Sequence, residues 1–214
     1  MSSRYWPFFD LRIRTPRLEL RYPDDDLLVE LATLAAGGVH APDRMPFNEP
    51  WTRAPKGELE VNALQFWWGR RARLKPDDWS IPFAVIEGGT LVGAQDLFSK
   101  DFAIRRSFES GSWLGIEHHG RGIGTEMRAA ILHLGFEGLG AEVAETGAFA
   151  DNPESQAVTR KLGYEPNGAF IRAREGQSAE IRMFSMTRSM WEARRRDDIT
   201  IEGLEACLPM LGLQ

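Results

Sequence analysis

Three glycines at alternate positions, directly before a predicted helix, are the residues of this sequence best suited to bind a phosphate group. Gly120, Gly122 and Gly124 follow a short apolar run at 113–116 and a polar turn. Glycine keeps Cβ atoms away from a group lying over the loop, and it lets successive backbone N–H groups point the same way. Unpaired N–H groups and the partial positive charge of a helix start add to this effect. These residues therefore predict a phosphate cradle.

The segment after the glycines is predicted to be a helix. Thr125 can cap it, and Glu126 places a negative charge in its first turn. Its apolar residues recur near helical spacing, at Met127, Ile131, Leu134 and Leu139. A strand, a loop and a helix therefore follow one another here.

Three kinds of phosphate-binding loop have a glycine spacing close to this one. A Rossmann loop requires Gly-x-Gly-x-x-Gly, but after Gly120 and Gly122 the third position is Thr125. A Walker A loop that begins at Gly115 reaches Gly120 and then departs, because Arg121 follows. The third pattern is Gln/Arg-x-x-Gly-x-Gly/Ala, the pyrophosphate loop of the GNAT acyltransferase superfamily. From the loop alone, a tight turn that binds no ligand stays open.

Residues 119–124 resemble the GNAT loop, and only His119 departs from its pattern. Further on, Asn152–Ser155 and Lys161–Tyr164 resemble the second GNAT signature, Asn-x-x-Ala/Ser ending in Lys-x-Gly-Phe/Tyr. The Gly-Ser-Trp-Leu at 111–114 is similar to the Gly-Tyr-Trp-Leu of the RimJ/RimL-like branch, which acetylates ribosomal-protein N-termini. Within that branch the chain most resembles actinobacterial members. Three matching elements in the same order carry the resemblance.

The resemblance implies an α/β (α+β) fold of the GNAT type, a mixed, mostly antiparallel sheet with splayed central strands and helices on both faces. A single domain over residues 1–214 is expected, with a core of about 17–187 and a C-terminal extension at 188–214. The tail after the basic residues 194–196 is expected to be loosely held. The elements expected from periodicity and turn signals are strands at 17–22, 80–87, 90–97, 109–116, 143–150, 164–174 and 179–187, with helices beginning near residues 24, 58, 125 and 152.

In GNAT enzymes the strand before the loop and the next strand part because of a bulge, and the pantetheine arm of CoA enters the gap. Carried over, this places the bulge at 113–116 and gives the pyrophosphate to the N–H groups of 121–125. The implied cofactor-binding residues are Trp113, Leu114, Ile116, His119, Arg121, Gly122, Ile123, Gly124, Thr125, Asn152 and Ser155. Plainer roles stay open for three of them: His119 as a loop histidine, Arg121 facing solvent, and Asn152 as a helix cap.

Acyl transfer to an amine needs a base for the amine proton and a donor that protonates the leaving thiolate. Many GNAT members use a tyrosine seven residues after the motif asparagine as the donor, but that position is Thr159 here. Ser155, on the same predicted helix, is the hydroxyl that the resemblance leaves. Glu109, where the branch often has glutamate, is the predicted base, and Asp96 is the alternative. A surface position for Glu109 and a backbone-bonded helix start for Ser155 stay open.

The predicted activity is that of an acyl-CoA-dependent N-acyltransferase. It would transfer an acetyl or succinyl group from acyl-CoA, as co-substrate, to a primary amine of a small molecule, peptide or protein by direct attack. Succinyl is considered because Lys100, Arg105 and Arg106 precede the strand at 109–116, and a cation can pair with a carboxylate. The missing tyrosine keeps an alternative open, a non-catalytic acyl-CoA binding or sensing module.

Composition limits the class of protein. The 214 residues are 43% hydrophobic and 27% charged, which suits one sizeable core, and the net charge of −5 argues against a nucleic-acid partner. Cys207 is the only cysteine, so no disulfide within the chain is expected. His118 and His119 lack a third ligand at useful spacing, so no metal is expected either. No apolar run approaches the ~20 residues that span a bilayer, which predicts a cytoplasmic protein without a membrane partner.

Two apolar regions predict a homodimer or larger assembly. Residues 1–16 carry four aromatic side chains, and Trp191 lies in a short amphipathic segment. The proline-rich stretch at 39–56 is expected to be a long functional loop. Its large side chains could line an acceptor pocket or simply cover the core: Met45, Phe47 and Trp51.

Overall fold

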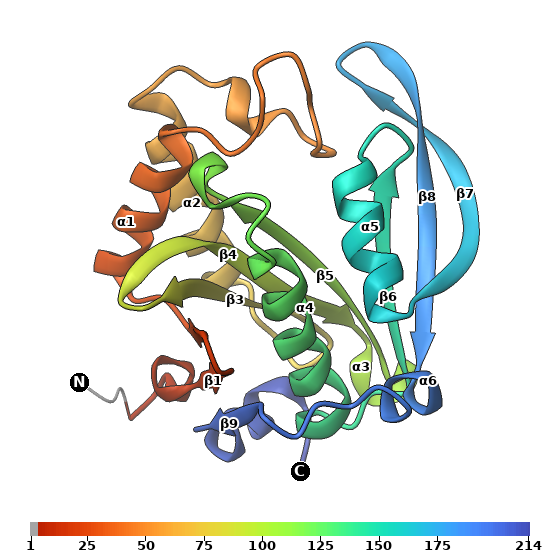
Figure 1. Ribbon diagram of the computed structural model, residues 1–214. Helices are drawn as coiled ribbons and strands as arrows, with labels where there is room; N and C mark the ends of the chain where they lie inside the picture. The colour runs from red at the N-terminus through yellow and green to blue at the C-terminus, as the bar shows by residue number, and fades with distance from the viewer. Residues whose placement is uncertain (1–3) are drawn as a thin grey trace.

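The centre of the protein is one mixed sheet (Figure 1). In the computed structural model, which describes residues 4–214, nine strands form it in the order β7-β8-β6-β5-β4-β3-β2-β1-β9. Every neighbouring pair is antiparallel except β5 with β6. The strands are β1 Arg12–Arg14, β2 Leu18–Arg21, β3 Asp78–Glu87, β4 Thr90–Lys100, β5 Ser107–Leu114, β6 Val143–Phe149, β7 Glu165–Arg174, β8 Gln177–Thr187 and β9 Thr200–Glu202. The predicted mixed, mostly antiparallel sheet is confirmed.

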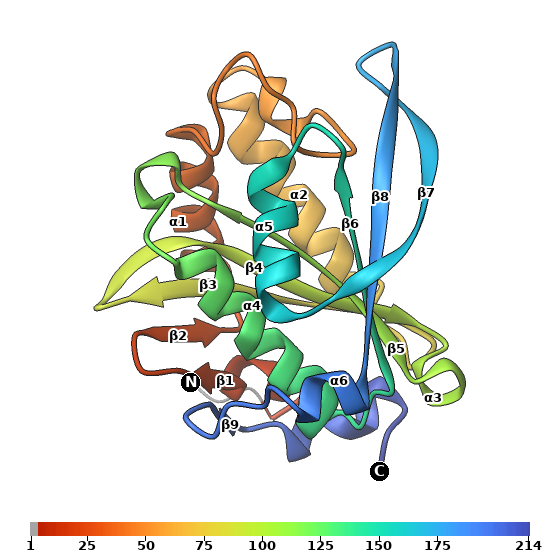
Figure 2. The same cartoon turned by 45° about the vertical axis from the view of Figure 1, so that its right-hand side comes forward.

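Helices cover both faces of the sheet, α1 and α2 on one side and α4 and α5 on the other (Figures 1 and 2). The helices are α1 Asp25–Ala36, α2 Glu58–Ala72, α3 Phe102–Arg105, α4 Ile123–His133, α5 Pro153–Leu162 and α6 Arg188–Glu192. Successive side chains of a strand point to opposite faces of the sheet, so one strand contributes apolar side chains to both layers. In β3, Phe83 and Val85 pack into the cluster that contains α4, whereas Ala84 packs with α1 and α2. In residues 4–214, none of these helices has the length and apolarity needed to cross a bilayer.

The helix starts follow local signals. The Asp24 carboxylate accepts the Leu27 N–H at 2.9 Å and caps α1. Helix α4 begins earlier than predicted: Gly122, with φ of 80°, is its N-cap, and Thr125 lies inside the first turn. Because glycine adopts a positive φ at little steric cost, the chain can turn into the helix at that point. The prediction that Thr125 caps the helix is wrong, and its N–H bonds to the Gly122 carbonyl at 3.2 Å.

Strands β5 and β6 diverge in the middle of the sheet. Their parallel pairing joins only 107–109 to 143–145, after which β5 stays with β4 and β6 stays with β8. The predicted splayed central strands are therefore confirmed. The bulge expected at 113–116 is not found in this ladder of the described chain: β5 pairs one-to-one with β4 up to Leu114, and Ile116 begins a 3₁₀ turn. The two strands separate because β5 continues its pairing with β4 while β6 continues its pairing with β8.

Both ends of the described chain complete the main core. Strands β1 and β9, neither of them predicted, pair at the sheet edge with Ile13 opposite Ile201. Phe8, Cys207 and Leu211 are fully buried. The expectation of a loosely held C-terminal tail is wrong, because these apolar side chains find their cover against each other and the sheet.

The apolar regions from which a dimer was predicted serve this same core. Trp191 is 5% exposed and stacks on Phe136 with ring centroids 5.2 Å apart. Near the N-terminus, Trp6 and Phe9 pack against the main core cluster. Tyr5, by contrast, is 80% exposed. The dimer thus stays a prediction with most of the surface that suggested it buried, and sedimentation at micromolar concentration tests it.

Candidate active site

The loop between β5 and α4 presents backbone donors at a helix start. Gly120 and Gly122 have positive φ values of 73° and 80°. Within residues 4–214, the N–H groups of 121–124 have no hydrogen-bond partner. A Cβ placed on Gly120 would meet nothing within 4 Å, so the loop is open on that side. Unpaired N–H groups at a helix start, in a loop without bulky side chains, fit an anion such as the pyrophosphate of CoA.

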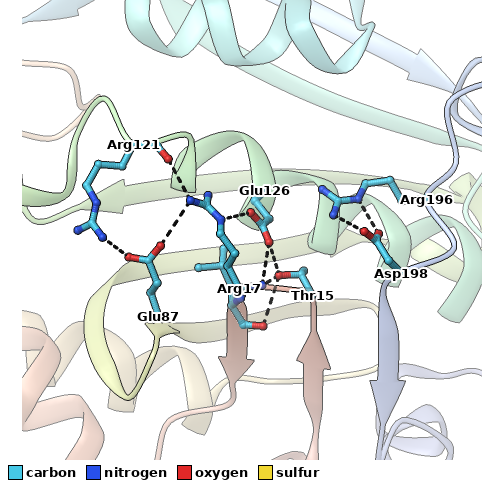
Figure 3. A network of polar contacts seen from close by, with 8 residues as sticks. Thr15, Arg17, Glu87, Arg121, Glu126, Arg196 and Asp198 are labelled. Carbon is cyan, nitrogen blue, oxygen red and sulfur yellow. Dashed lines mark hydrogen bonds and ion pairs between the residues drawn. The ribbon is translucent and has the colours of Figure 1, made fainter.

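Arginine and glutamate side chains brace this loop against the sheet (Figure 3). The Arg121 guanidinium donates to the Glu87 carboxylate at 2.5 Å and lies 3.2 Å from His118 Nδ1. Arg17 donates to Glu126 at 2.7 Å and to the Arg121 carbonyl at 3.2 Å. Because Glu87 matches the charge of Arg121, the backbone N–H groups carry the cradle, and the Arg121 side chain holds the loop in place.

The main-chain groups predicted to meet pantetheine differ in their availability. The Gly115 N–H bonds to the Val92 carbonyl at 3.0 Å, and residues along an antiparallel ladder alternate, so the peptide groups of Leu114 face the β5–β6 gap. The N–H of Ile116 is already engaged, because it donates to the Gly38 carbonyl at 3.0 Å. The structure therefore offers Leu114, rather than Ile116, to a chain that enters the gap.

The side chains at the start of α5 make internal hydrogen bonds. Asn152 is the N-cap, and its Oδ1 accepts the Ser155 N–H at 3.1 Å. The Thr159 hydroxyl is fully buried and donates to the Ser155 carbonyl at 2.9 Å, so it is not free to act as the missing tyrosine. His119 Nε2 donates to the Leu114 carbonyl at 3.2 Å. By contrast, no hydrogen bond ties the Ser155 side chain to the rest of the described chain, which leaves its hydroxyl available as a donor.

On the α1–α2 side of the sheet, a carboxylate stands beside a glycine. Asp96 of β4 is in register with Gly111 of β5, and its Oδ1 is buried with no hydrogen-bond partner among residues 4–214. Burial raises the pKa of Asp96 to about 7, and Arg70 of α2 offsets this only in part. A carboxyl group of that pKa, opposite a glycine of β5 and without a partner of its own, fits the role of a proton acceptor near neutral pH.

Glu109 lies on β5, and its side chain is on the same face of the sheet as that of Asp96. It is in register with Glu145 of β6. Burial and then Glu145 raise the pKa of Glu109, while Arg105 opposes the shift. Glu109 is exposed to solvent and borders a cavity of about 330 Å³. The other charged side chains that line this cavity are Arg70, Asp78, Lys100, Arg105 and Glu145. This position suits a group that attracts a charged acceptor toward the gap.

The loop at 39–56 covers this side of the sheet and reaches the β7–β8 hairpin (Figure 1). Arg174 of β7 donates to the Met45 carbonyl at 2.8 Å, and the Met45 side chain is only 5% exposed. Trp51 packs against Trp113 of β5, with ring centroids 6.1 Å apart. Met45 therefore packs in the interior, whereas Trp51 and Trp113 pack against each other beside β4, the strand that contains Asp96.

Comparison with known proteins identifies the family. The family model described as "Acetyltransferase (GNAT) domain" matches residues 17–165. This chain belongs to the GNAT acetyltransferase family. The match includes the glycine loop and the start of α5.

Solved structures show the same GNAT fold at low sequence identity. A GCN5-related N-acetyltransferase from Brucella melitensis is 21% identical with a TM-score of 0.69, over 86% of this chain and 81% of that one. RimL, a ribosomal alpha-N-protein acetyltransferase in complex with coenzyme A, is 18% identical with a TM-score of 0.65, over 81% and 95%. Mutant forms of the spermidine/spermine N-acetyltransferase SpeG from Vibrio cholerae are 16% identical with a TM-score of 0.63, over 84% and 99%.

Proposed function

We propose that this GNAT protein transfers a short acyl group from acyl-CoA to a primary amine by direct attack. The observation that carries the proposal is the placement of two groups around the β5–β6 gap. The N–H cradle lies at the start of α4, on one side of the sheet, and the unpartnered Asp96 carboxylate faces α2 on the other. A donor held by the cradle and reaching through the gap would meet an amine beside Asp96.

Each step has a group of this chain to perform it. Bound acyl-CoA supplies an acyl group activated as a thioester. The N–H groups of 121–124 hold its pyrophosphate, and the Leu114 N–H, which faces the gap, can polarise a carbonyl. Asp96 takes one proton from the amine as the C–N bond forms. Ser155 gives one proton to sulfur as the C–S bond breaks, and solvent returns a proton from Asp96 to Ser155, so the charges balance.

The direct test is release of CoA when the protein is mixed with acetyl-CoA and a panel of amines, read with a thiol reagent and by mass spectrometry of the acceptors. We expect release that depends on the amine and an acceptor mass gain of one acyl group. Binding of CoA without release for any amine would contradict the proposal.

That second outcome would support a non-catalytic acyl-CoA sensor, which one observation favours. The position of the usual tyrosine acid is Thr159, whose hydroxyl is buried and bonded within α5. A sensor would bind acyl-CoA through the same cradle without turning it over.

We assign the base to Asp96 rather than to Glu109, which the sequence favoured. The Asp96 carboxylate is sheltered, unpartnered and beside a glycine, whereas Glu109 is exposed and next to another carboxylate. Glu109→Gln should therefore raise KM for a cationic acceptor about three- to tenfold and leave kcat within about threefold, because one attractive charge is lost at the entrance. Steady-state kinetics measure this, with Glu165→Gln on exposed strand β7 as control. A kcat loss near 10²-fold with unchanged KM would return the base role to Glu109.

Ser155→Ala should lower kcat about 10- to 100-fold and leave the Kd for CoA within about twofold, because the leaving sulfur loses its proton donor. The Asn152 cap survives this change, since it uses the Ser155 backbone N–H. Calorimetry gives the Kd and CoA release gives kcat. The exposed Ser178→Ala is the matched control, and an unchanged kcat in Ser155→Ala would remove Ser155 from the mechanism.

We propose that the acceptor is cationic, and that an α-amine is a better acceptor than a lysine side chain. RimL acts on a protein α-amine and SpeG on spermidine or spermine. Asp78 and Glu145 of the cavity are paired with Lys100 and Arg105, whereas Glu109 forms no ion pair within residues 4–214 and can attract either kind of cation. An α-amine with a pKa of ~7.7–8.0 is roughly a tenth neutral at pH 7, whereas a lysine at ~10.4 is well under a thousandth neutral. A base whose pKa is about 7 suits the first far better.

A further inference from the structure

A buried arginine of α4 bridges the two strands that part. Arg128 is 5% exposed. Its Nη1 donates to Thr146 Oγ1 of β6 at 3.3 Å, and its Nη2 donates to Ser112 Oγ of β5 at 3.3 Å. The last paired residues of the two strands are Glu109 and Glu145. The guanidinium therefore lies at the narrow end of the β5–β6 gap, on the side of the sheet that α4 covers.

Arg128 has no anionic partner. Among residues 4–214 no carboxylate forms an ion pair with it, and its Nε is buried without a hydrogen-bond partner. Burial lowers the pKa of the Arg128 guanidinium, and the neighbour that opposes this is the Tyr164 hydroxyl, not an acid. By contrast Arg121 and Arg17 each pair with a glutamate. A buried charge without an opposite charge is costly, and an arginine stays protonated even so.

Two buried hydroxyl groups lie near Arg128, and neither belongs to an acid. Tyr164 Oη and Ser110 Oγ are both buried and unpartnered. The Tyr164 hydroxyl lies beside Ser110 and Arg128, and burial raises its pKa to about 12, so it keeps its proton near neutral pH. Three buried donor groups, one of them charged, therefore converge here, and the acceptors that Arg128 finds in the described chain are the neutral hydroxyls of Ser112 and Thr146. An anion with two oxygens would satisfy them, and arginine matches the geometry of a carboxylate.

The gap connects this cluster to the path of the acyl group. Ser112 is two residues before Leu114, whose peptide groups face the gap, and both lie on β5 beyond its last pairing with β6. We propose that Arg128, together with Tyr164 and Ser110, binds the terminal carboxylate of a dicarboxylic acyl group of three or four carbons carried by CoA. This inference rests on the proposed acyl-CoA function and names the class of acyl donor.

In this proposal Arg128 binds the acyl carboxylate, a role that the sequence analysis suggested for Lys100, Arg105 and Arg106. Lys100 pairs with Asp78 at 3.6 Å and Arg105 pairs with Glu145 at 3.5 Å. Both border the cavity on the α2 side, where Glu109 lies. Their charges are matched there. The third predicted cation, Arg106, forms no ion pair within residues 4–214, but it is exposed and lies over the Phe102 ring. Arg128 is buried and its charge is not matched, so we assign to it the selection of an acidic acyl chain.

The test is calorimetry without any amine, so that no turnover occurs. Wild-type protein is titrated with succinyl-CoA, acetyl-CoA and CoA, and we expect succinyl-CoA to bind at least tenfold more tightly than acetyl-CoA. Arg128→Met keeps the volume and removes the charge. It should weaken succinyl-CoA at least 30-fold and change acetyl-CoA and CoA less than threefold. The exposed Arg160→Met on α5 is the matched control and should keep the wild-type preference.

Tyr164→Phe provides a second variant if Arg128→Met does not fold. It should weaken succinyl-CoA about fivefold and leave acetyl-CoA unchanged, because only the dicarboxylic chain uses the hydroxyl. Equal wild-type affinity for the two thioesters would overturn the inference, as would an Arg128→Met variant that loses all three ligands alike. In both cases CoA binding by the wild type would still support the proposed function. Failure of the wild type to bind CoA at millimolar concentration would overturn both.

Discussion

Replacing Gly122 with glutamate should weaken CoA binding at least 100-fold. Gly122 is the N-cap of α4 and has a φ of 80°, a conformation that costs other residues roughly 1–2 kcal/mol. The new carboxylate would also stand among the unpaired N–H groups of 121–124, where it would repel a pyrophosphate and compete for its donors. A Cβ at this position meets only Arg17 Nη2 at 3.7 Å, so the packing tolerates the side chain and the charge is decisive.

Two further variants separate charge from strain in this experiment. Gly122→Ala imposes the same backbone strain without a carboxylate and should weaken CoA less than tenfold. Gly168→Glu places the same residue at a φ of 94° on strand β7, where a Cβ meets nothing within 4 Å, and should leave the affinity unchanged. Calorimetry with CoA gives the three values. A Gly122→Glu protein that keeps its affinity within twofold would place the CoA pyrophosphate elsewhere.

The features that the sequence predicted well are those set by residue type over a few neighbouring positions. The glycines at 120–124 could be interpreted because only a loop without side chains presents its N–H groups in this way. The strands at 80–87 and 90–97 and the helix that begins near residue 24 are local in the same sense, and all three are present as β3, β4 and α1. The splay of β5 and β6 came instead from the family resemblance.

The features that the sequence missed depend on which side of an element faces which neighbour. Arg128 lies on the stripe of α4 shared by Gly124, Ile131 and Leu132, so its helical position alone indicated burial. That signal becomes useful only once α4 is known to cover the gap. The C-terminal strand β9 was missed because three residues are too few to show the alternation of apolar and polar residues typical of a strand. The pairing that stabilises them is with β1, which is far away in the sequence.

Asp96→Asn should lower kcat about 10²- to 10⁴-fold at pH 7 with an α-amine acceptor, the second large effect that we expect. Asparagine keeps the size of the side chain and cannot take the proton of the amine. The ratio of wild-type to variant kcat/KM should fall as pH drops below about 7, because the wild-type carboxyl is then protonated as well. At pH 10 the ratio should also shrink, since the acceptor is neutral without help. Measuring kcat/KM from pH 5.5 to 10 for the wild type and the variant tests the expected decrease of the ratio at both low and high pH.

The same substitution should stabilise the fold at alkaline pH, which would not be expected of an aspartate whose carboxylate is held by hydrogen bonds or an ion pair. Burial raises the Asp96 pKa from 3.8 to about 7, so between these values the folded state holds a proton that the unfolded state has lost. Stability from this group therefore falls as pH rises through that range, by up to about 4 kcal/mol above pH 7. Asparagine has no such loss, so the Tm of Asp96→Asn should exceed that of the wild type at pH 8 and approach it at pH 4. A variant that keeps wild-type kcat, or that is less stable at pH 8, would exclude Asp96 as a sheltered base and leave Glu109 as the residue to test.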